Sequence, residues 1–399
     1  MEPHPAIQYD FVVPTKIIFG WGRRREVGSL LRAMGHRCFV VWGSRTLAAS
    51  SVGAEILSGV QDAGLDVVRL TTIDHEPEVA DVDAAARSLH DHKAGPHDVV
   101  LAIGGGSAMD LGKAVAALAT NRGSETVKDY LEGVGRGLAI IHPPLPLVVM
   151  PTTSGTGSEA TKNAVISSYD PPFKKSLRSE LMLPRCVVVD PELTISMPPA
   201  ITAQSGMDAV TQLIESYISR RARPIPQALA VQGLHLAVPA LVQAIRQPHN
   251  RQAREAMSHA ALLSGMALAN SGLGLAHGVA AALGVHCRVP HGLACGVMLP
   301  WALRANHIVC TTQYAELAGA LGLMSESTVA ASPAAAADAF VERIQQLCRE
   351  VGLPSHLADL GVGREQIPDL VRSSRGNSMD GNPRLVSDEE LTALLEEAL

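Results

Sequence analysis

Aromatic side chains and basic charge are both scarce in this chain of 399 residues. Phe, Trp and Tyr make up only 3% of the sequence, so its cores must be built from the abundant Ala, Val, Leu and Gly, which suit close packing of helices on a sheet or on each other. A formal charge of −6 at pH 7 leaves no excess of the basic residues that contact nucleic acid. We therefore expect no nucleic-acid partner.

The sequence also shows no disulfide framework and no secretory or membrane-spanning pattern. The six cysteines are scattered and form no CxxC pair, as is usual in a reducing cytosol. The opening MEPHPAIQYD has neither a basic start nor an apolar stretch, so we expect no signal peptide. The apolar runs VVLAI and PLPLVVM are too short to span a bilayer. The sequence thus predicts a cytoplasmic protein with no membrane partner.

The first half of the chain alternates short apolar runs with helical stretches. Continuous rather than alternating apolar runs are typical of strands that are buried on both faces. Strand, helix and strand in succession imply a doubly wound, Rossmann-like parallel sheet. The predicted strands are 38–42, 66–70, 99–103, 147–150 and 186–189, with helices at 54–63 and 81–93.

The pattern changes after Asp190. Long helical patterns follow at 203–220, 226–244 and 252–269, and few β-branched runs remain. A chain of this length is too long for one ordinary core, so we expect an α/β dinucleotide-binding domain over 1–190 and a helical metal and substrate domain over 191–399. Because open α/β sheets bind ligands at the carboxyl ends of their strands, the active site is expected in the cleft between the two domains.

Two glycine-rich loops each follow a predicted strand. In Gly104–Ser107 (GGGS), the glycines let the backbone approach a pyrophosphate, and the N–H groups of the following helix then face the anion. In 151–159 (PTTSGTGSE), hydroxyls and amides can line the nicotinamide-ribose side of a cofactor. Alternatively, the first loop is only a tight turn, and the second is a turn capped by Thr156 or Ser158. Two such loops after two parallel strands favour a dinucleotide site.

A candidate metal site combines residues from two helical regions. Asp208 and Gln212 are four residues apart on a predicted helix and share a face. His277 and His291 follow in a glycine-rich helical region. One aspartate and two histidines with an open position form a plausible divalent-metal site that can polarise a carbonyl group. The alternative is a solvated helix face and two structural histidines.

The turn after the strand at 38–42 bears on the choice of cofactor. A dehydrogenase that prefers NAD tends to place an acid there, which accepts a hydrogen bond from the ribose 2′-OH. Here the turn holds Gly43, Ser44 and Arg45, which fit a 2′-phosphate better. We therefore predict that NADP(H) is favoured over NAD(H). If Arg45 is only a solvated surface charge, NAD(H) is used.

Five ordered motifs resemble the signatures of the iron-containing (group III) alcohol dehydrogenases: GGGSAMDLGKAVA, PTTSGTGSEAT, DPELT, SGMDAVTQLIESY, and LGLAHGVAAALG followed by PHGLACGVMLP. The opening FVVPTKIIFGWG is also similar, and the motif-level resemblance runs from about residue 10 to 310. It implies an NAD(P)-dependent enzyme that transfers hydride between a nicotinamide cofactor and a small alcohol or aldehyde. A divalent metal, Fe²⁺ or Zn²⁺, would polarise the substrate oxygen. We also expect a homo-oligomer, such as a homodimer.

The resemblance assigns roles residue by residue. Asp208, His277 and His291 match three metal ligands and are the expected catalytic residues, and Gln212 stands where the family usually has a fourth, histidine ligand. The pyrophosphate and ribose contacts are matched by Gly105, Gly106, Ser107 and Asp110. Further residues expected to line the cofactor are Thr152, Thr153, Thr156, Asn163 and Lys174.

Two departures from the family pattern change the expected chemistry. The amide oxygen of Gln212 can coordinate, but it is neutral and a weaker donor than imidazole, so oxygen-favouring ions gain over soft ones. Ala281 stands where the family often has a histidine that is available for proton transfer. The proton must then move through water, a cofactor ribose hydroxyl or another side chain, for which His286 is a candidate.

Other activities remain open at this point. A metal-dependent cyclase resembling dehydroquinate synthase shares the fold, but the SGMDAVTQ and PHG patterns favour a dehydrogenase. A metal-independent reductase and a non-catalytic nucleotide-binding protein are further alternatives; the presence of Asp208, His277 and His291 together argues against the latter. No cluster of basic residues is evident at the cleft. The sequence therefore leaves the substrate open, from small aldehydes to acidic ones. Arg288 is a candidate contact for an anionic substrate.

Overall fold

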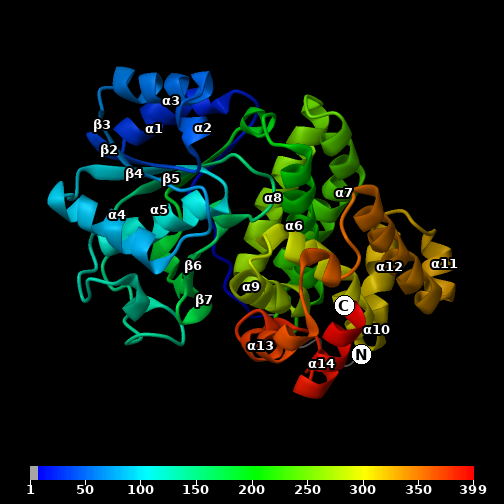
Figure 1. Ribbon diagram of the computed structural model, residues 1–399. Helices are drawn as coiled ribbons and strands as arrows, with labels where there is room; N and C mark the ends of the chain where they lie inside the picture. The colour runs from blue at the N-terminus through cyan, green and yellow to red at the C-terminus, as the bar shows by residue number, and fades with distance from the viewer. Residues whose placement is uncertain (1–7) are drawn as a thin grey trace.

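The structure is a computed structural model that describes residues 8–399. A sheet domain and a helical domain lie side by side (Figure 1). The last strand of the sheet ends at Val189, and the first long helix of the helical domain begins at Pro199.

The sheet domain is built on six parallel strands in the order β1-β8-β5-β4-β2-β3. From β2 the chain continues to β3 on one side, and from β4 it continues to β5 and β8 on the other side. The carboxyl ends of β2 and β4 therefore form the switch point, where doubly wound sheets bind ligands. The expected α/β architecture is thereby confirmed. The strands are β1 (Ile17–Phe19), β2 (Arg37–Trp42), β3 (Asp66–Thr72), β4 (Asp98–Gly104), β5 (Leu147–Pro151) and β8 (Cys186–Val189).

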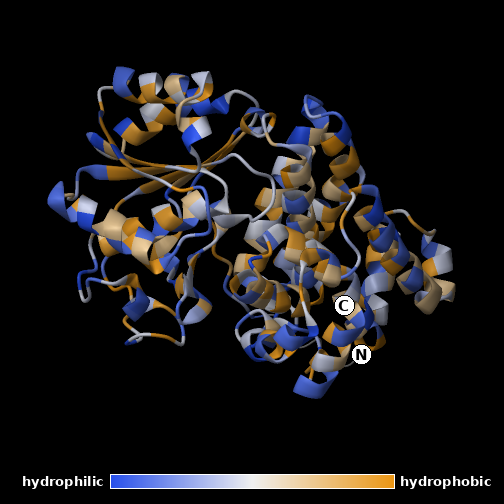
Figure 2. Ribbon diagram, viewed as in Figure 1, coloured by the Kyte–Doolittle hydropathy of each residue, from blue (hydrophilic) through white to orange (hydrophobic). Residues whose placement is uncertain are grey.

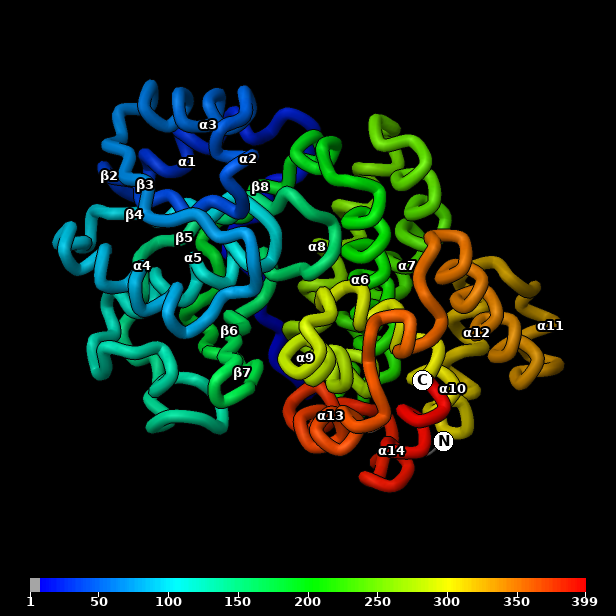
Figure 3. The backbone as a smooth tube through the Cα atoms, viewed as in Figure 1, coloured from blue at the N-terminus to red at the C-terminus, as the bar shows by residue number. Residues whose placement is uncertain are grey.

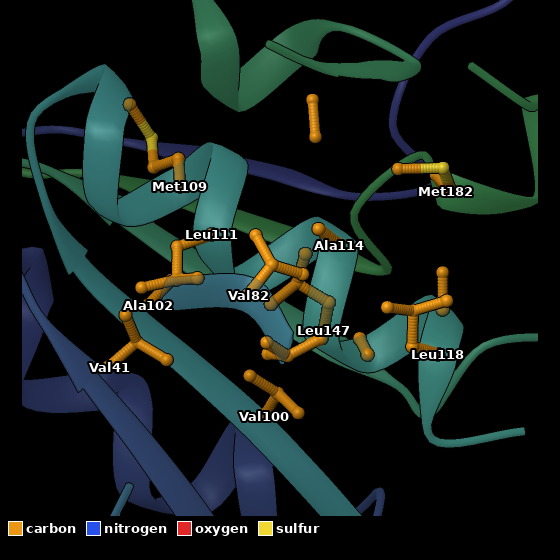
Figure 4. Packing of buried hydrophobic residues seen from close by; sticks show 14 of the residues in the cluster. Val41, Val82, Val100, Ala102, Met109, Leu111, Ala114, Leu118, Leu147 and Met182 are labelled. Atoms are coloured by element: carbon orange, nitrogen blue, oxygen red, sulfur yellow. The ribbon is translucent and has the colours of Figure 1, made fainter. Parts of the chain in front are cut away.

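Helices cover both faces of this sheet, because successive strand residues point to opposite sides. On one face, Val40 and Trp42 of β2 pack with residues of α1 (Val27–Arg32) and α3 (Ser51–Asp62). On the other face, α4 (Val79–Asp91) and α5 (Gly106–Leu118) cover the cluster that Figure 4 shows around Val41 and Val100. The strands accordingly stand out as hydrophobic in Figure 2.

The sequence interpretation missed an antiparallel hairpin formed by β6 (Asn163–Tyr169) and β7 (Pro172–Arg178). One signal was present, since Asp-Pro-Pro is a turn sequence that follows a run containing Val165, Ile166 and Tyr169. The hairpin packs beside α9, between the two domains (Figure 3). It therefore carries Asn163 and Lys174 to the interdomain region.

The helical domain confirms the three long helices predicted after Asp190. They are α6 (Pro199–Ile218), α7 (Pro224–Arg246) and α8 (Arg251–Ser271), and one core joins them to α10 and α12. The remaining helices are α9 (Leu275–Cys287), α10 (His291–Ala320), α11 (Glu326–Ala331), α12 (Pro333–Glu350), α13 (Ile367–Ser373) and α14 (Asp388–Ala398).

Two of these helices, α7 and α10, are long and apolar enough to cross a membrane when judged by length and composition alone. The sequence interpretation considered only short apolar runs and did not note them. In the structure α7 packs against α6 and α8, and α10 packs against α6, α9 and α12. Their apolar residues thus contribute to the core of the helical domain.

The two domains touch backbone to backbone at a pair of glycines. A Cβ atom on Gly265 of α8 would lie 2.1 Å from the carbonyl oxygen of Gly157, and a Cβ atom on Gly157 would lie 2.4 Å from the Cα atom of Gly265. Gly157 also has a φ of 60°, which favours glycine. No side chain can be accommodated at either residue, so the second glycine-rich loop is held directly against the helical domain.

Candidate active site

The GGGS loop lies at the switch point of the sheet. Gly105 precedes α5, which begins at Gly106. Gly104 has a φ of 156°, and a Cβ atom on Gly43 would lie 2.6 Å from its Cα atom, so the ends of β2 and β4 approach too closely for any other residue. Glycine at residue 43 thus has a steric reason that is independent of the cofactor.

The second glycine-rich loop packs directly on the first. The Thr152 amide donates to the Gly104 carbonyl oxygen at 2.9 Å. Cβ atoms on Gly105 and Gly106 would meet the methyl groups of Thr153 and Thr156 at 3.3 Å and 2.7 Å. Thr156 Oγ1 also accepts a hydrogen bond from the Ser158 amide at 3.2 Å, so the capped-turn interpretation holds for this residue as well. The structure therefore brings the two predicted cofactor loops together.

Asp110 lies at the same cavity, but its carboxylate is engaged inside the protein. It accepts hydrogen bonds from the Ser158 hydroxyl and, at 2.9 Å, from the Val165 amide, and it forms an ion pair with Lys113 at 3.1 Å. These contacts fasten α5 to the second loop and to the hairpin. Asp110 is one of the residues that the resemblance matches to the pyrophosphate and ribose contacts, and it lines the cavity; its contact with a cofactor stays a prediction.

Lys113 forms the centre of a buried polar cluster under the hairpin. Its ammonium donates to the Thr161 hydroxyl at 2.8 Å and to the Asn163 carbonyl at 2.6 Å, and its side chain is fully buried. Burial lowers the pKa of Lys113, and burial raises the pKa of the neighbouring Glu159 to about 7. The cluster fixes the base of the hairpin that faces the active-site cavity.

The candidate metal ligands converge between three helices. The Nε2 atom of His277 on α9 lies 3.2 Å from Asp208 Oδ1 on α6. The Nε2 atom of His291, at the start of α10, lies 4.0 Å from the same oxygen. Asp208 and Gln212 are both buried, so they do not form the solvated helix face that was the alternative interpretation.

Cys295 joins this cluster and was missed in the sequence. One ligand atom from each of Asp208, His277, His291 and Cys295 lies within 4.8 Å of the others. The Cys295 Sγ atom is 3.7 Å from His291 Nε2. The signal was its spacing, because residues four apart on a helix lie on one face. The thiol escaped notice because the start of α10 was not predicted at His291.

Glu215, two helical turns after Asp208, is the second residue that the sequence interpretation missed. Its Oε2 atom lies 2.6 Å from Nδ1 of His277, and its carboxylate accepts from the backbone amides of Gly274 at 3.0 Å and Ala276 at 2.7 Å. A carboxylate that holds the outer nitrogen of a metal-binding histidine fixes the orientation and tautomer of the ring. Glu215 therefore aims His277 Nε2 at the cluster.

The ionisation states of Asp208 and His291 suit a cation, whereas that of His277 does not. Although burial works to raise the pKa of Asp208, hydrogen bonding to His277 and the charges around it lower that pKa below its usual value. Burial and the Lys174 ammonium lower the pKa of His291 to about 4, so its ring is neutral. Burial opposes protonation of His277, but Cys295, Asp208 and Glu215 raise its pKa well above the usual range. Metal binding must therefore displace that proton.

A cavity of about 290 Å³ joins the loops, the hairpin and the cluster. Of the predicted residues that do not line it, Gly43, Ser44, Gly105, Thr152 and Thr153 lie along the adjoining strand ends, and Asp208 is buried behind the histidines. Two orphaned polar atoms belong to residues of the cavity wall, because Asn163 Oδ1 and His291 Nδ1 are buried without a hydrogen-bond partner. The predicted residues in the wall are Gly106, Ser107, Asp110, Thr156, Asn163, Lys174, Gln212, His277 and His291.

His286 and Arg288 lie away from this cavity. The His286 ring bonds to the Ser373 hydroxyl at 2.7 Å and lines a neighbouring cavity. The Arg288 guanidinium is exposed and stacks on the Tyr169 ring, 3.2 Å from its centroid. Neither residue contacts the metal cluster, and Ala281 lines the cavity without a polar group.

The expectation that no basic residues gather at the cleft was wrong. The neighbouring cavity, of about 500 Å³, brings together residues from β7 and from the segment around α13, which are far apart in the sequence. Most of these cations are already paired, for example Arg178 with Glu132 and Arg375 with Asp388. The cations are Lys174, Lys175, Arg178, Arg372 and Arg375.

Replacement of Glu215 by Gln is expected to weaken metal binding by about 10- to 100-fold, as for other outer partners of metal-bound histidines. The amide is nearly isosteric but carries no charge to hold the His277 ring. Isothermal titration of the metal-stripped protein with Zn²⁺ measures the change, with Glu316→Gln as the control, since Glu316 accepts from Tyr217 outside the site. An unchanged affinity would remove Glu215 from this role.

Comparisons with known proteins agree with this geometry. The model of the family described as "Iron-containing alcohol dehydrogenase" matches residues 14–191, and that described as "Fe-containing alcohol dehydrogenase family, C-terminal" matches residues 202–399. The 1,3-propanediol dehydrogenase of Klebsiella pneumoniae is 33% identical over 395 residues, covering 98% of both chains.

Solved structures give the same result. A crystal structure of 1,3-propanediol oxidoreductase has a TM-score of 0.90 at 31% identity and covers 98% of this chain and 100% of that chain. Sulfoacetaldehyde reductase from Bifidobacterium kashiwanohense in complex with NAD⁺ has a TM-score of 0.84 at 31% identity, covering 98% and 99%. With both halves matched by family models and nearly the whole length matched by these relatives, the chain belongs to the iron-containing alcohol dehydrogenase family.

Proposed function

We propose that the protein interconverts small aldehydes and alcohols with NADP(H) as the preferred cofactor and with one divalent cation held in the Asp208 cluster. The observation that carries this proposal is the single cavity that joins the glycine-rich loops to His277 and His291. As a member of its family, the protein is an oxidoreductase that acts on alcohols and aldehydes.

The residues present fit both the cation and the nicotinamide cofactor. A carboxylate oxygen and two imidazole nitrogens from three helices lie within 4.8 Å of one another, so that small side-chain shifts allow them to share one ion. Asn163 Oδ1, buried without a partner on a residue of the cavity wall, offers an acceptor to an amide or hydroxyl donor of a cofactor. The N-terminus of α5 beside Gly105 offers backbone donors to a pyrophosphate. A bound cation would supply a Lewis acid toward the substrate oxygen.

The protein's own groups orient and enclose the reactants. Asp208, fixed by hydrogen bonds from His277 and Gln212, holds its charge beside the two histidines of the cavity wall. Glu215 fixes the His277 ring. Lys174, paired with Glu76 at 2.7 Å, places a cation at the wall, and burial together with this cation lowers the pKa of His291 and keeps its ring neutral. Preorganised charge of this kind is usually the largest contribution to the rate.

Residue 281 is an alanine, so its side chain cannot transfer a proton. Among the described residues of the cavity wall, the only imidazoles are His277 and His291, both of which face the cluster. His286 lies in the neighbouring cavity. We therefore propose that solvent or a cofactor ribose hydroxyl delivers the proton to the alcohol oxygen.

The preference for NADP(H) is best tested at Ser44. Because Gly43 abuts the Gly104 backbone, a side chain there would disturb the sheet and not only the cofactor. Ser44 instead caps α2 (Arg45–Ala48) by accepting from the Leu47 amide at 3.0 Å, and aspartate caps helices equally well. Ser44→Asp is therefore expected to keep the fold and to shift the kcat/KM ratio toward NADH by at least about tenfold, since its carboxylate repels a 2′-phosphate and accepts from a 2′-OH.

Steady-state kinetics with NADPH and NADH measure this shift, and Ser50→Asp is the matched control, because Ser50 caps α3 away from the loop. A wild-type protein with a tenfold better kcat/KM for NADH would contradict the preference itself. An unchanged ratio in Ser44→Asp would show that this turn does not contact the ribose.

The activity is tested with a panel of aldehydes and alcohols, both cofactors, and protein stripped of metal and reloaded with Fe²⁺, Zn²⁺ or Mn²⁺. Metal-dependent turnover of added NAD(P)H is expected. A dehydroquinate-synthase-like cyclase would not consume external NAD(P)H with a carbonyl substrate. Full activity with less than about a tenth of an equivalent of divalent metal would instead indicate a metal-independent reductase, because a tightly held catalytic ion could not explain the rate.

The cellular location is also a proposal. All six cysteines are free thiols, five of them buried, which supports the reducing cytoplasm that we propose.

A further inference from the structure

We propose that Cys295, and not Gln212, supplies the fourth protein ligand of the metal, so that the site is a thiolate, carboxylate and two-imidazole set suited to Zn²⁺. This inference rests on the proposed function, in which a cation binds at the cluster. It changes the ligand set that the family resemblance implied, and it favours Zn²⁺ among the two metals expected.

The spacing of the donor atoms supports this assignment. Zinc–ligand distances of about 2.0–2.3 Å in a tetrahedron place neighbouring ligand atoms roughly 3.3–3.7 Å apart. Asp208 Oδ1 and His277 Nε2 are 3.2 Å apart, Cys295 Sγ and His291 Nε2 are 3.7 Å apart, and His291 Nε2 lies 4.0 Å from Asp208 Oδ1. All four atoms lie within 4.8 Å of one another. Small side-chain shifts are therefore enough to close the site around an ion.

Gln212 presents the wrong group to the metal. Its amide nitrogen lies 3.1 Å from both the Thr156 carbonyl oxygen and Asp208 Oδ1, which are acceptors. Its amide oxygen faces the Ser264 hydroxyl at 2.7 Å. Rotating the amide to offer oxygen to the metal would place that oxygen against the Thr156 carbonyl oxygen and would remove the donor that this carbonyl now has. Gln212 therefore orients the Asp208 carboxylate as a hydrogen-bond donor, a role typical of outer partners in metal sites.

Gln212 and Cys295 occupy equivalent places on two helices of the cluster. Asp208 and Gln212 are one turn apart on α6, and His291 and Cys295 are one turn apart on α10. Each helix can present a pair of side chains toward the same point. Where the family usually takes two ligands from the first helix, this chain can take two from the second.

Cys295 differs from the other buried thiols of the protein. Cys310 lies on the same helix and is equally buried, but it packs in the apolar core among α6, α7, α10 and α12. Such a thiol is an ordinary small hydrophobic group. Cys295, by contrast, has an imidazole nitrogen at 3.7 Å and a carboxylate oxygen within 4.8 Å. Cys310 is therefore the matched control.

The chemistry balances without an additional reactant. On binding M²⁺, the Cys295 thiol loses one proton to solvent and forms an S–M bond, and His277 releases to solvent the proton that it holds before the metal binds; the oxidation state of the metal does not change. One thiolate and one carboxylate then neutralise the two positive charges. Thiolate is a soft ligand that selects Zn²⁺ over oxygen-favouring ions, which reverses the preference expected for a glutamine ligand. The substrate oxygen would enter as a fifth ligand, an expansion that catalytic zinc sites undergo.

The test uses the full-length protein, stripped of metal and reloaded with either Co²⁺ or Zn²⁺. With Co²⁺, we expect a thiolate-to-cobalt charge-transfer band in the near ultraviolet for the wild type, for Cys310→Ala and for Gln212→Ala. Cys295→Ala is expected to lack this band. X-ray absorption of the zinc form should show one sulfur at about 2.3 Å. Cys295→Ala should also lower the affinity for Zn²⁺ by more than about 100-fold, which exceeds the effect of losing a residue that only contacts a ligand.

Two results would overturn the assignment in distinguishable ways. One equivalent of bound metal without a sulfur ligand in the wild type would exclude Cys295 and leave the proposed function intact. Failure of the wild type to bind either ion would overturn both the assignment and the metal-dependent function. Thermal unfolding of each variant identifies a loss of binding that is caused by misfolding. Cys295→Ser is the conservative second variant. A folded Cys295→Ser protein that keeps the sulfur signal would also contradict the proposal.

Discussion

His277→Ala is expected to lower kcat/KM for an aldehyde substrate by about 10³-fold, because the change removes a metal ligand and misplaces the reacting oxygen, and small misplacements cost about 10²-fold by themselves. The ring is held from both sides, by Glu215 at Nδ1 and by Asp208 at Nε2. Alanine leaves both buried carboxylates without that donor. Steady-state kinetics at saturating Zn²⁺ measure the effect.

His286→Ala is the control for this prediction, since His286 lies in the neighbouring cavity and bonds only to Ser373. It should retain activity within a few-fold of the wild type. A folded His277→Ala protein with activity within tenfold of the wild type would show that the cluster does not carry the reaction.

Lys113→Met is expected to lower the free energy of unfolding by about 3–5 kcal/mol, the cost of removing one partner from a buried ion pair. Lys113 is fully buried and donates to Thr161 and to the Asn163 carbonyl, so the change also leaves the Asp110 carboxylate without its countercharge. Because those groups fasten the hairpin to α5, cofactor binding should weaken as well. Denaturant unfolding at pH 7 measures the stability.

The matched control is Lys162→Met, which removes a cation from a surface pair with Glu180 at 3.1 Å. Exposed pairs contribute only about 0–1 kcal/mol, so this variant should unfold almost as the wild type does. Equal unfolding free energies for the two variants would mean that the Lys113 ion pair does not stabilise the fold.

The sheet could be predicted because its strands are short continuous apolar runs, a signal that lies within each segment. Trp42 and Val100, for example, lie in apolar runs that predict buried strands, and both residues are buried. The hairpin was missed because its strands are half-exposed and mixed in polarity, so neither shows a clear period. Its packing partner, α9, lies about a hundred residues later and leaves no trace in the local sequence.

The candidate site was only partly predictable for a similar reason. Spacing on one helix placed Asp208 and Gln212 on a common face, but it could not show that the Gln212 amide turns its nitrogen inward. That orientation depends on the Thr156 carbonyl of the other domain and on Ser264 of α8. Cys295 reaches the cluster only because α10 begins at His291. Such facts depend on contacts between distant segments, which periodicity does not describe.

The glycine contact between Gly157 and Gly265 has a consequence for how such enzymes diversify. All the donors of the metal cluster come from the helical domain, whereas the loops expected to bind the cofactor come from the sheet domain. Mutations that retune the metal and mutations that retune the nucleotide can therefore accumulate on separate gene segments. At the Gly157–Gly265 contact there is no side chain to repack, so this contact fixes how closely the second glycine-rich loop approaches α8. In directed evolution, libraries built in the two halves should combine nearly additively, except at residues that contact each other across the joint, such as Gln212 and Thr156.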